Sequence, residues 1–334
     1  MKKYLLPESG NFYKANLHCH STVSDGKWTV EEIKKNYMEQ GYSIVAFTDH
    51  DVLIPHYELN DENFLALNGV EFEFDEGGKW GKQWKNCHFC AIALEPDNIT
   101  QPCWHREKYQ FSNAVNYRDK VKFDDSEADW EREYSPECIS RMMKNCREKG
   151  FFVTYNHPTW SMEGYRDYMG YNGMHAMEVC NYGCVSAGFD DRNSKEYDEM
   201  LRGGKRIYCI ATDDNHNGRA DSFGGFTMIK AEKLEYKTVT DALLKGNFYA
   251  SEGPIINALW FEDGKVHITF EPARKAFITK GVRGAKIAEA QDGGLITEAV
   301  FDVEEDDIYF RITVETPDGK RAYTNAYFPD DIVK

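Results

Sequence analysis

The stretch YKANLHCHSTVSDGKWTVEEIKKNYMEQGYSIVAFTDH, residues 13–50, contains a strand-like segment, a helical segment and a second strand-like segment in that order. Thr29 and Glu32 have the spacing of a capping box at the start of the helix. Gly41 stands where a helix C-cap belongs. The stretch therefore predicts a parallel β-α-β unit.

Strand-like and helical segments continue to alternate up to about residue 250, which is typical of an α/β fold with parallel strands. Ser135 is the expected N-cap of a later helix that has Pro136 at its first position and Gly150 at its end. The expected strands cover residues 13–20, 42–50, 64–72, 87–94, 151–158, 175–181 and 206–216, and the expected helices cover 29–41 and 135–150.

Two segments depart from this alternation. Residues 95–134 are aromatic, polar and charged, and we interpret them as an insertion that covers the functional site. After Pro254 the sequence shows strand-like alternation and turn signals without a helical pattern. We therefore expect an α/β domain over residues 1–254 and a small all-β, sandwich-like domain over residues 255–334.

Composition excludes several classes of partner. The formal net charge of −16 disfavours non-specific binding to nucleic acid or to an anionic membrane. The amino terminus lacks the apolar core of a signal peptide, and no run of residues is long enough to span a bilayer. Nine irregularly spaced cysteines argue for a reducing compartment. The sequence thus predicts a cytoplasmic protein with a small-molecule substrate, and it leaves the oligomeric state open.

His18 and His20 are two residues apart, so on a strand both side chains point to the same face. Two imidazoles in this arrangement can converge on one metal ion. The pair alone is equally consistent with two histidines placed by chance.

Ligand-type residues recur at the other expected strand ends. In parallel α/β folds the carboxyl ends of the strands meet at one rim, so these residues would lie together. One such residue could equally be a hydrogen-bonded core histidine or an acid that caps a helix, but the whole set favours a metal centre. The set contains His18, His20, Asp25, His50, Glu71, His88, His157, Asp214 and His216.

Imidazole and carboxylate ligands without thiolates suit Zn, Mn or Fe(II) and do not choose among them. Two or three divalent cations would outweigh the three carboxylates of the set. An acidic protein could in this way hold an anionic substrate such as a phosphate ester.

The segments NLHCHSTVSDG, AFTDHD, GVEF, YNHP and TDDNH resemble, in this order, the motifs of the PHP (polymerase and histidinol phosphatase) family of metal-dependent phosphoesterases. The resemblance covers roughly residues 11–254. It implies a distorted (β/α)7 barrel, a TIM-like arrangement, that holds two or three divalent ions. The implied ligand groups are His18, His20, Glu71 and Asp214; Glu71, His88 and His157; and Asp25, His50 and His216.

The resemblance also implies hydrolysis by a water that the metal ions activate. Asp214 is the candidate general base, although it could serve only as a ligand. Arg219 and Asn181 are the candidates for substrate contact, with an ordinary surface arginine as the alternative for Arg219.

Three functions remain open at this point. The first is a phosphoesterase that acts on a small phosphorylated metabolite or nucleotide. The second is a carboxyl ester or carbamate hydrolase, because GNFYASEGP (246–254) and AYTNAYF (322–328) are similar to the CehA/McbA-like branch of the superfamily. The third is a non-catalytic metal-binding module.

Overall fold

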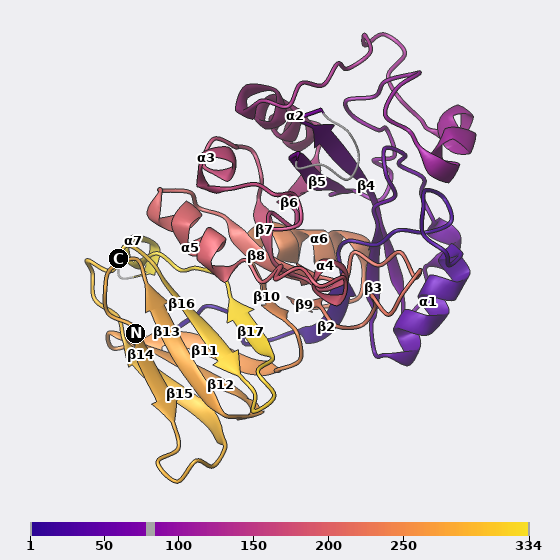
Figure 1. Ribbon diagram of the computed structural model, residues 1–334. Coiled ribbons are helices and arrows are strands. Elements are labelled where there is room, and N and C mark those ends of the chain that lie inside the picture. Colours follow the sequence, from indigo (N-terminus) through magenta and orange to yellow (C-terminus); the bar gives the residue numbers. More distant parts are fainter. Residues whose placement is uncertain (1, 78–83, 333–334) are drawn as a thin grey trace.

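The computed structural model describes residues 2–77 and 84–332 (Figure 1). Within them, seven strands surround the site in the sheet order β2-β3-β4-β5-β6-β7-β8. Their bounds are β2 (Asn11–Asn16), β3 (Ile44–Phe47), β4 (Leu65–Asp75), β5 (Asn86–Ala93), β6 (Phe151–Tyr155), β7 (Ala176–Asn181) and β8 (Tyr208–Thr212).

The two ends of this row of strands meet. The backbone N–H of Asp214, just after β8, donates to the carbonyl of His18 at 3.0 Å. The N–H of His20, beyond β2, donates to the carbonyl of Asn215 at 3.1 Å. The seven strands therefore form a distorted barrel, and the expected mixed α/β fold is confirmed.

One strand runs against the sequence-based expectation. β5 is antiparallel to both β4 and β6, whereas the other neighbours in the row are parallel. The connection from β4 to β5 covers only residues 76–85, fewer than the dozen or more that a parallel crossover needs. The expectation that every ligand follows a carboxyl strand end was therefore wrong for His88, which lies near the amino end of β5.

The expected helix ends are confirmed. Glu32 N donates to Thr29 Oγ1 at 3.3 Å, and Thr29 N donates to Glu32 Oε2 at 2.8 Å, so the capping box is complete. Ser135 caps its helix by accepting from Cys138 N at 3.3 Å. The helices of the described residues are α1 (Val30–Glu39), α2 (Pro136–Glu148), α3 (Tyr165–Tyr168), α4 (Tyr182–Ser186), α5 (Ser194–Arg202), α6 (Tyr236–Lys245) and α7 (Pro329–Ile332), with the short 3-10 helices η1 (Tyr57–Leu59) and η2 (Ser112–Lys120).

Four strands end at least three residues earlier than the sequence pattern predicted. β2 stops at Asn16, β3 at Phe47, β6 at Tyr155 and β8 at Thr212, so the ligand residues that follow them lie beyond the ladder. There the backbone bonds partly to side chains, as when Cys19 N donates to Thr48 Oγ1 at 3.0 Å. Loops after the strands thus position the ligands.

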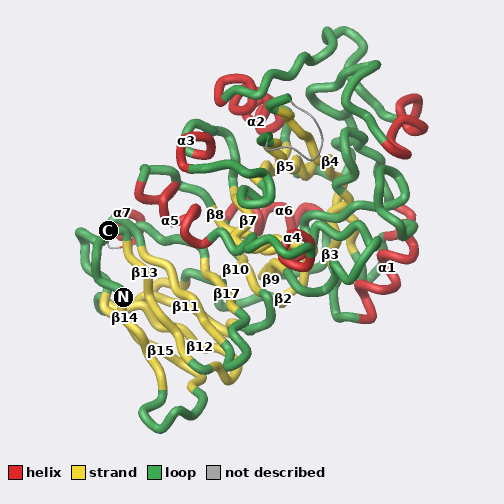
Figure 2. Tube along the Cα trace, in the orientation of Figure 1, coloured by secondary structure: helices red, strands yellow, loops and turns green. Residues whose placement is uncertain are grey.

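Residues 95–134 consist mainly of loop with the 3-10 helix η2 (Figure 2). The segment stands where the sequence predicted an insertion. It contributes Tyr109, Gln110 and Phe111 to a cavity beside the strand ends.

The C-terminal strands are antiparallel, as expected, with α7 as one short helix at their end. Two of these C-terminal strands pair with strands from before residue 254: β11 pairs with β1, and β17 pairs with β10. The domain boundary at residue 254 stays a prediction. The remaining strands are β1 (Lys3–Tyr4), β9 (Phe226–Ala231), β10 (Phe248–Ser251), β11 (Ile256–Glu262), β12 (Lys265–Ala273), β13 (Lys275–Lys280), β14 (Lys286–Glu289), β15 (Ile296–Asp302), β16 (Phe310–Glu315) and β17 (Arg321–Thr324).

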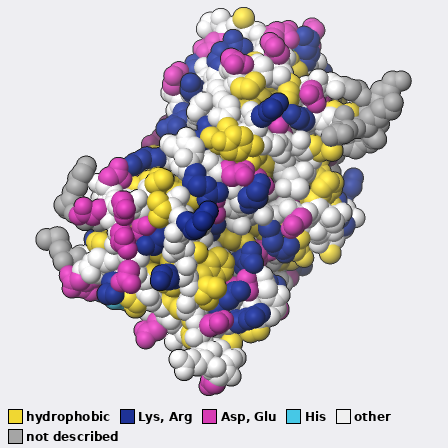
Figure 3. All heavy atoms as spheres, turned by 60° about the vertical axis from the view of Figure 1, so that its left-hand side comes forward, with side chains coloured by type: hydrophobic (Ala, Val, Ile, Leu, Met, Phe, Trp, Pro, Cys, Tyr) yellow, Lys and Arg dark blue, Asp and Glu magenta, His cyan; other side chains and the backbone are white. Residues whose placement is uncertain are grey.

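The surface carries charges of both signs. On the face shown in Figure 3, Lys and Arg side chains are interspersed with Asp and Glu side chains. Among the residues that the structure describes, none of the helices combines the length and the apolar character needed to cross a membrane.

Candidate metal centre

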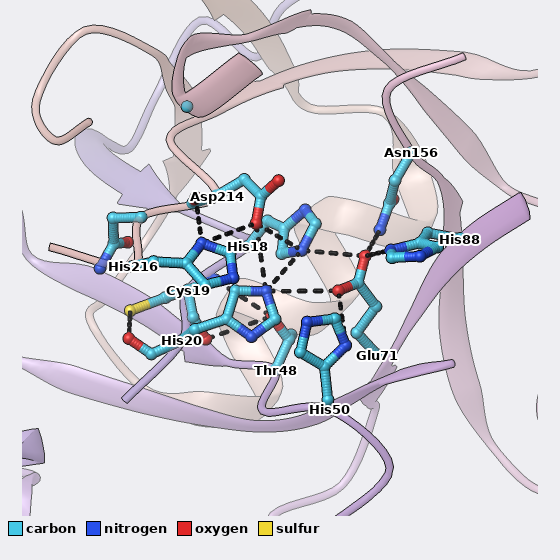
Figure 4. A network of polar contacts seen from close by, with 12 residues as sticks. His18, Cys19, His20, Thr48, His50, Glu71, His88, Asn156, Asp214 and His216 are labelled. Atoms are coloured by element: carbon cyan, nitrogen blue, oxygen red, sulfur yellow. Dashed lines mark hydrogen bonds and ion pairs between the residues drawn. The ribbon is translucent and has the colours of Figure 1, made fainter. Parts of the chain in front are cut away.

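The structure brings all nine predicted ligand residues together at one end of the barrel. Seven of them, all except Asp25 and His157, are labelled in Figure 4. Glu71 belongs to β4, His88 lies near the start of β5, and the others follow β2, β3, β6 and β8. Seven of the nine are buried, whereas Asp25 and His216 are partly exposed. Asp25 and His216 are thus the most exposed members of the centre.

Glu71 is the centre of the cluster. Its side chain is 1% exposed and points into the barrel, where five imidazoles surround its two oxygens. A carboxylate that has imidazoles beside each of its two oxygens can bridge two cations. Oε1 lies 3.0 Å from His18 Nε2, 3.2 Å from His88 Nδ1 and 3.5 Å from His157 Nε2, and Oε2 lies 3.3 Å from His20 Nε2 and 3.3 Å from His50 Nδ1.

Three groups of side chains place their ligand atoms within 4.8 Å of one another. Two groups share Glu71, and His20 and His50 also belong to two groups each. His157 belongs to none of the three, although its Nε2 lies 3.8 Å from Asp214 Oδ2. The groups are His18, His20, Glu71 and Asp214; His50, Glu71 and His88; and His20, Asp25, His50 and His216.

Five buried polar atoms in the cluster lack hydrogen-bond partners, and their positions show whether the residues fit a cation. Such atoms are costly to bury unless something else satisfies them. Nε2 of His18 and Nε2 of His20 also lie only 3.1 Å apart, so two ring nitrogens face each other. Divalent cations would satisfy these groups. The unpartnered atoms are His20 Nδ1, His50 Nδ1, Glu71 Oε2, His88 Nε2 and Asp214 Oδ1.

Electrostatics favour ionised carboxylates in this cluster. Burial opposes ionisation of Asp214, but the neighbouring His18, His20 and His216 hold its pKa well below the ordinary value. Burial and the nearby His20 lower the pKa of His50 to about 3. The cluster therefore contains ionised carboxylates and at least one neutral imidazole. These are the protonation states in which carboxylates and histidines bind metal ions.

The turn after His20 explains why Gly26 follows Asp25. A Cβ atom at Gly26 would lie 2.5 Å from the carbonyl oxygen of His20. Only glycine permits this close approach, which brings Asp25 Oδ1 to 3.8 Å from His20 Nδ1.

Asp49 holds the same loop to the end of β3. Its Oδ1 accepts from Ser21 N at 2.8 Å and from Ser24 Oγ at 2.7 Å, and its Oδ2 accepts from Ser21 Oγ at 2.8 Å. Asp49 therefore organises the backbone that carries His20 and Asp25.

Glu178 of β7 contacts the predicted ligand His18, and sequence reasoning assigned it no place in the site. Its Oε1 accepts from His18 Nδ1 at 2.8 Å and from Thr212 Oγ1 at 2.6 Å. Its Oε2 accepts from the backbone N–H of His157 at 3.0 Å. The sequence signal that could have identified it is an acidic residue within the apolar segment AMEVC, and the structure shows that this residue is fully buried.

The two predicted substrate residues are placed differently. Arg219 lines the cavity, and its guanidinium donates to Gly183 O at 2.8 Å. Asn181 is fully buried, and its amide donates to Glu178 Oε2 at 2.9 Å and to Asp214 Oδ2 at 3.1 Å. These contacts tie Asn181 to Asp214. A substrate role for Arg219 or for Asn181 stays a prediction.

No protein-family model matches this chain. A 5'-3' exoribonuclease from Haemophilus influenzae is 27% identical over 113 residues, which cover 33% of this chain and 40% of that protein. The chain therefore matches only about two fifths of the length of this curated relative.

Two solved structures are similar to this chain at low TM-scores. A two-domain protein from Bacteroides vulgatus, described as containing a predicted PHP-like metal-dependent phosphoesterase, covers 97% of this chain and 98% of its own, with 14% identity and a TM-score of 0.42. A protein from Bifidobacterium adolescentis, described as a candidate metal-dependent phosphoesterase, covers 72% of this chain and 98% of its own, with 15% identity and a TM-score of 0.42. At these identities and TM-scores the family and the chemistry have to be argued from the site itself.

Proposed function

We propose that this chain is a metal-dependent hydrolase that cleaves phosphate esters of small molecules. The convergence of eight further nitrogen- and oxygen-bearing side chains on Glu71, with five buried atoms that lack hydrogen-bond partners, is the observation that carries the proposal. His18, His20, Glu71 and Asp214 would hold one ion, and Glu71 would share a second with His88 and His157. Asp25, His50 and His216 would complete a third site, so that each imidazole serves one ion.

Divalent ions in such a centre supply a Lewis acid and a water of lowered pKa. The chain's own residues would orient the reactants. Glu178 accepts from His18 Nδ1, so it leaves Nε2 of His18 as the nitrogen that faces Glu71. Arg219 can turn its guanidinium toward an anionic oxygen in the cavity.

Asp214 is better suited to bind a cation than to accept a proton. Its Oδ2 already accepts from Asn181, and its pKa lies well below the ordinary value because histidines surround it. A base of such low pKa accepts a proton poorly at neutral pH. We therefore assign Asp214 the ligand role, and the general-base role is the alternative.

The proposal is tested by phosphate release from a panel of phosphomonoesters and diesters with Mn, Zn or Fe(II) added. We expect turnover that a chelator abolishes and that Glu71→Gln lowers by at least about 100-fold. Glu298→Gln, on the exposed surface of β15, is the matched control and should leave turnover unchanged. A metal-loaded wild type that releases no phosphate from any ester would overturn the proposal.

A carboxyl ester or carbamate hydrolase is the second candidate. Glu73 and Asp75 add two carboxyl groups to the cavity beyond the ligand set, which favours a neutral substrate over a polyanionic one. Naphthyl acetate tested beside nitrophenyl phosphate separates the two functions. Full metal loading without hydrolysis of either ester would instead favour the non-catalytic module.

A further inference from the structure

The cavity beside the metal-ligand cluster is much larger than a phosphate group. It has a volume of about 710 Å³, which lies in the range of sites for whole organic ligands. Phosphate bound at the cluster would fill only one part of it. The remaining wall must therefore contact the organic part of the substrate.

Aromatic side chains form this wall at two places. The Phe111 ring lies 4.8 Å from the His50 ring, measured between centroids, and Phe111 is 36% exposed. The Trp160 ring lies 5.1 Å from the His88 ring. Tyr109 also lines the cavity. Rings that border both the ligand histidines and open space offer an apolar surface to a group attached to the phosphate.

Arg132 fixes Tyr109 in this wall. The buried guanidinium pairs with both carboxylate oxygens of Asp51, with Nη1 at 3.0 Å from Oδ2, and it donates to Glu73 O at 2.9 Å. Its carbon Cζ lies 4.0 Å from the centre of the Tyr109 ring, and its backbone N–H donates to Tyr109 Oη at 2.9 Å. Arg132 therefore joins the wall to the residue that follows His50.

The wall segment needs this support because its backbone is strained. Tyr109 has a φ of +76° and Ser112 has a φ of +50°, a region that side-chain-bearing residues rarely adopt. On the other side, Asn113 N donates to Ser24 O at 3.0 Å, next to Asp25. The wall is thus held at both ends by loops that carry predicted ligands.

The charge of the cavity limits which organic group fits. Among the described residues that line it, Arg219 is the sole lysine or arginine. Glu73 and Asp75 lie on the same face of β4 as Glu71 but outside the three ligand groups. An anionic organic group would therefore meet two further carboxyl groups, of which Glu73 lies 3.5 Å from His88 Nε2 through its Oε2.

From these contacts we infer that Tyr109, Phe111 and Trp160 form a leaving-group subsite for a planar, apolar and uncharged group, and that Arg132 is the positioning residue for its Tyr109–Phe111 side. The inference rests on the proposed phosphoesterase function. It adds the substrate class, namely phosphate esters of planar apolar alcohols or phenols.

Binding of phosphonates tests the subsite independently of turnover. Titration calorimetry on the metal-loaded protein would compare benzylphosphonate with n-propylphosphonate. We expect wild type to bind the benzyl compound roughly three- to tenfold more tightly. We expect Phe111→Ala to bring this ratio close to one, with metal content unchanged. A carboxylate at the para position of the benzyl ring should weaken binding to wild type.

Arg132→Lys tests the positioning role. Lysine keeps a cation opposite Asp51 but cannot make the two-point pair, so the benzyl preference should fall towards that of Phe111→Ala. Arg141→Lys is the matched control, because Arg141 stacks on Trp130 outside this cavity. Melting temperature and metal content measured in parallel separate mispositioning from unfolding, and Tyr109→Ala serves as the second variant if Arg132→Lys does not fold.

The outcomes keep the two proposals apart. Absence of phosphate release from every ester overturns the proposed function. An enzyme that releases phosphate but binds both phosphonates equally, or binds neither, overturns the subsite. A benzyl preference that survives unchanged in Arg132→Lys, or in Tyr109→Ala where that variant replaces it, overturns the positioning role alone.

Discussion

Nδ1 of His18 lies 2.8 Å from Oε1 of Glu178, and both side chains are buried almost completely. The carboxylate accepts a hydrogen bond from Nδ1–H and so leaves Nε2 as the ring nitrogen that is free to bind a cation. A pair formed by residues 160 positions apart thus decides the chemistry of the first predicted ligand.

Glu178→Gln should weaken metal binding without displacing the strand. The amide can still contact His18, but it no longer holds the Nδ1–H tautomer through a carboxylate, so we expect metal affinity to fall about 10- to 100-fold. Competition with a chromophoric chelator measures this change. Glu262→Gln, on β11, is the control, and equal affinities for wild type and Glu178→Gln would contradict the assigned role.

Gly26→Ala should empty the group formed by His20, Asp25, His50 and His216 before the others. The added Cβ would meet His20 O at 2.5 Å, so the turn that carries Asp25 has to move. We expect metal content to drop by about one ion per chain, as measured by elemental analysis. Gly218→Ala meets no atom within 4 Å and should keep the wild-type content.

His175 should make stability depend on pH. Burial, aided by Arg147, lowers its pKa to about 4, and Val153 N donates to its Nδ1 at 3.0 Å, which requires an unprotonated nitrogen. The folded state thus binds fewer protons than the unfolded state, whose histidine pKa is about 6.5. The contribution of neutral His175 to the free energy of unfolding is present above pH 6.5 and is lost as the pH falls from about 6.5 to about 4.

Between pH 7 and pH 5 we expect a loss of at most about 2 kcal/mol in the free energy of unfolding. Urea unfolding of the metal-free protein at pH 7 and at pH 5 measures it, and His175→Gln should show a smaller difference. The same pH dependence in wild type and His175→Gln would refute the assignment.

Arg311→Met should destabilise the attachment of the C-terminal strands. Arg311 pairs with Asp198 of α5 through Nε at 2.8 Å and Nη2 at 2.7 Å, and both residues are buried. Removing the cation leaves a buried carboxylate with only the Tyr309 hydroxyl as a side-chain donor, so we expect a loss of about 3–5 kcal/mol. Lys265→Met, which breaks the exposed pair with Asp302, should cost less than about 1 kcal/mol in the same urea experiment.

The local part of the fold was predictable from sequence. Capping residues such as Thr29 and Ser135 act within one turn of the chain, and the structure places them as expected. The direction of β5 was missed because the pattern of apolar residues is the same in either direction. Only the short connection over residues 76–85 carried that information.

The candidate site was predictable because ligand-type residues recur near strand ends. His88 was included although its strand runs the other way, since the amino end of an antiparallel strand reaches the same rim. Glu178 and Arg132 were missed because their partners, His18 and Asp51, are 160 and 81 positions away in the chain. Such pairings follow from tertiary packing and leave no local pattern.

The most direct test of the metal centre is the divalent metal content of wild type and Glu71→Gln after loading and gel filtration. Two of the three ligand groups share Glu71, so we predict two to three ions per chain in wild type and at most one in Glu71→Gln. A wild type that retains no divalent metal, or a Glu71→Gln variant that retains as much as wild type, would contradict the account.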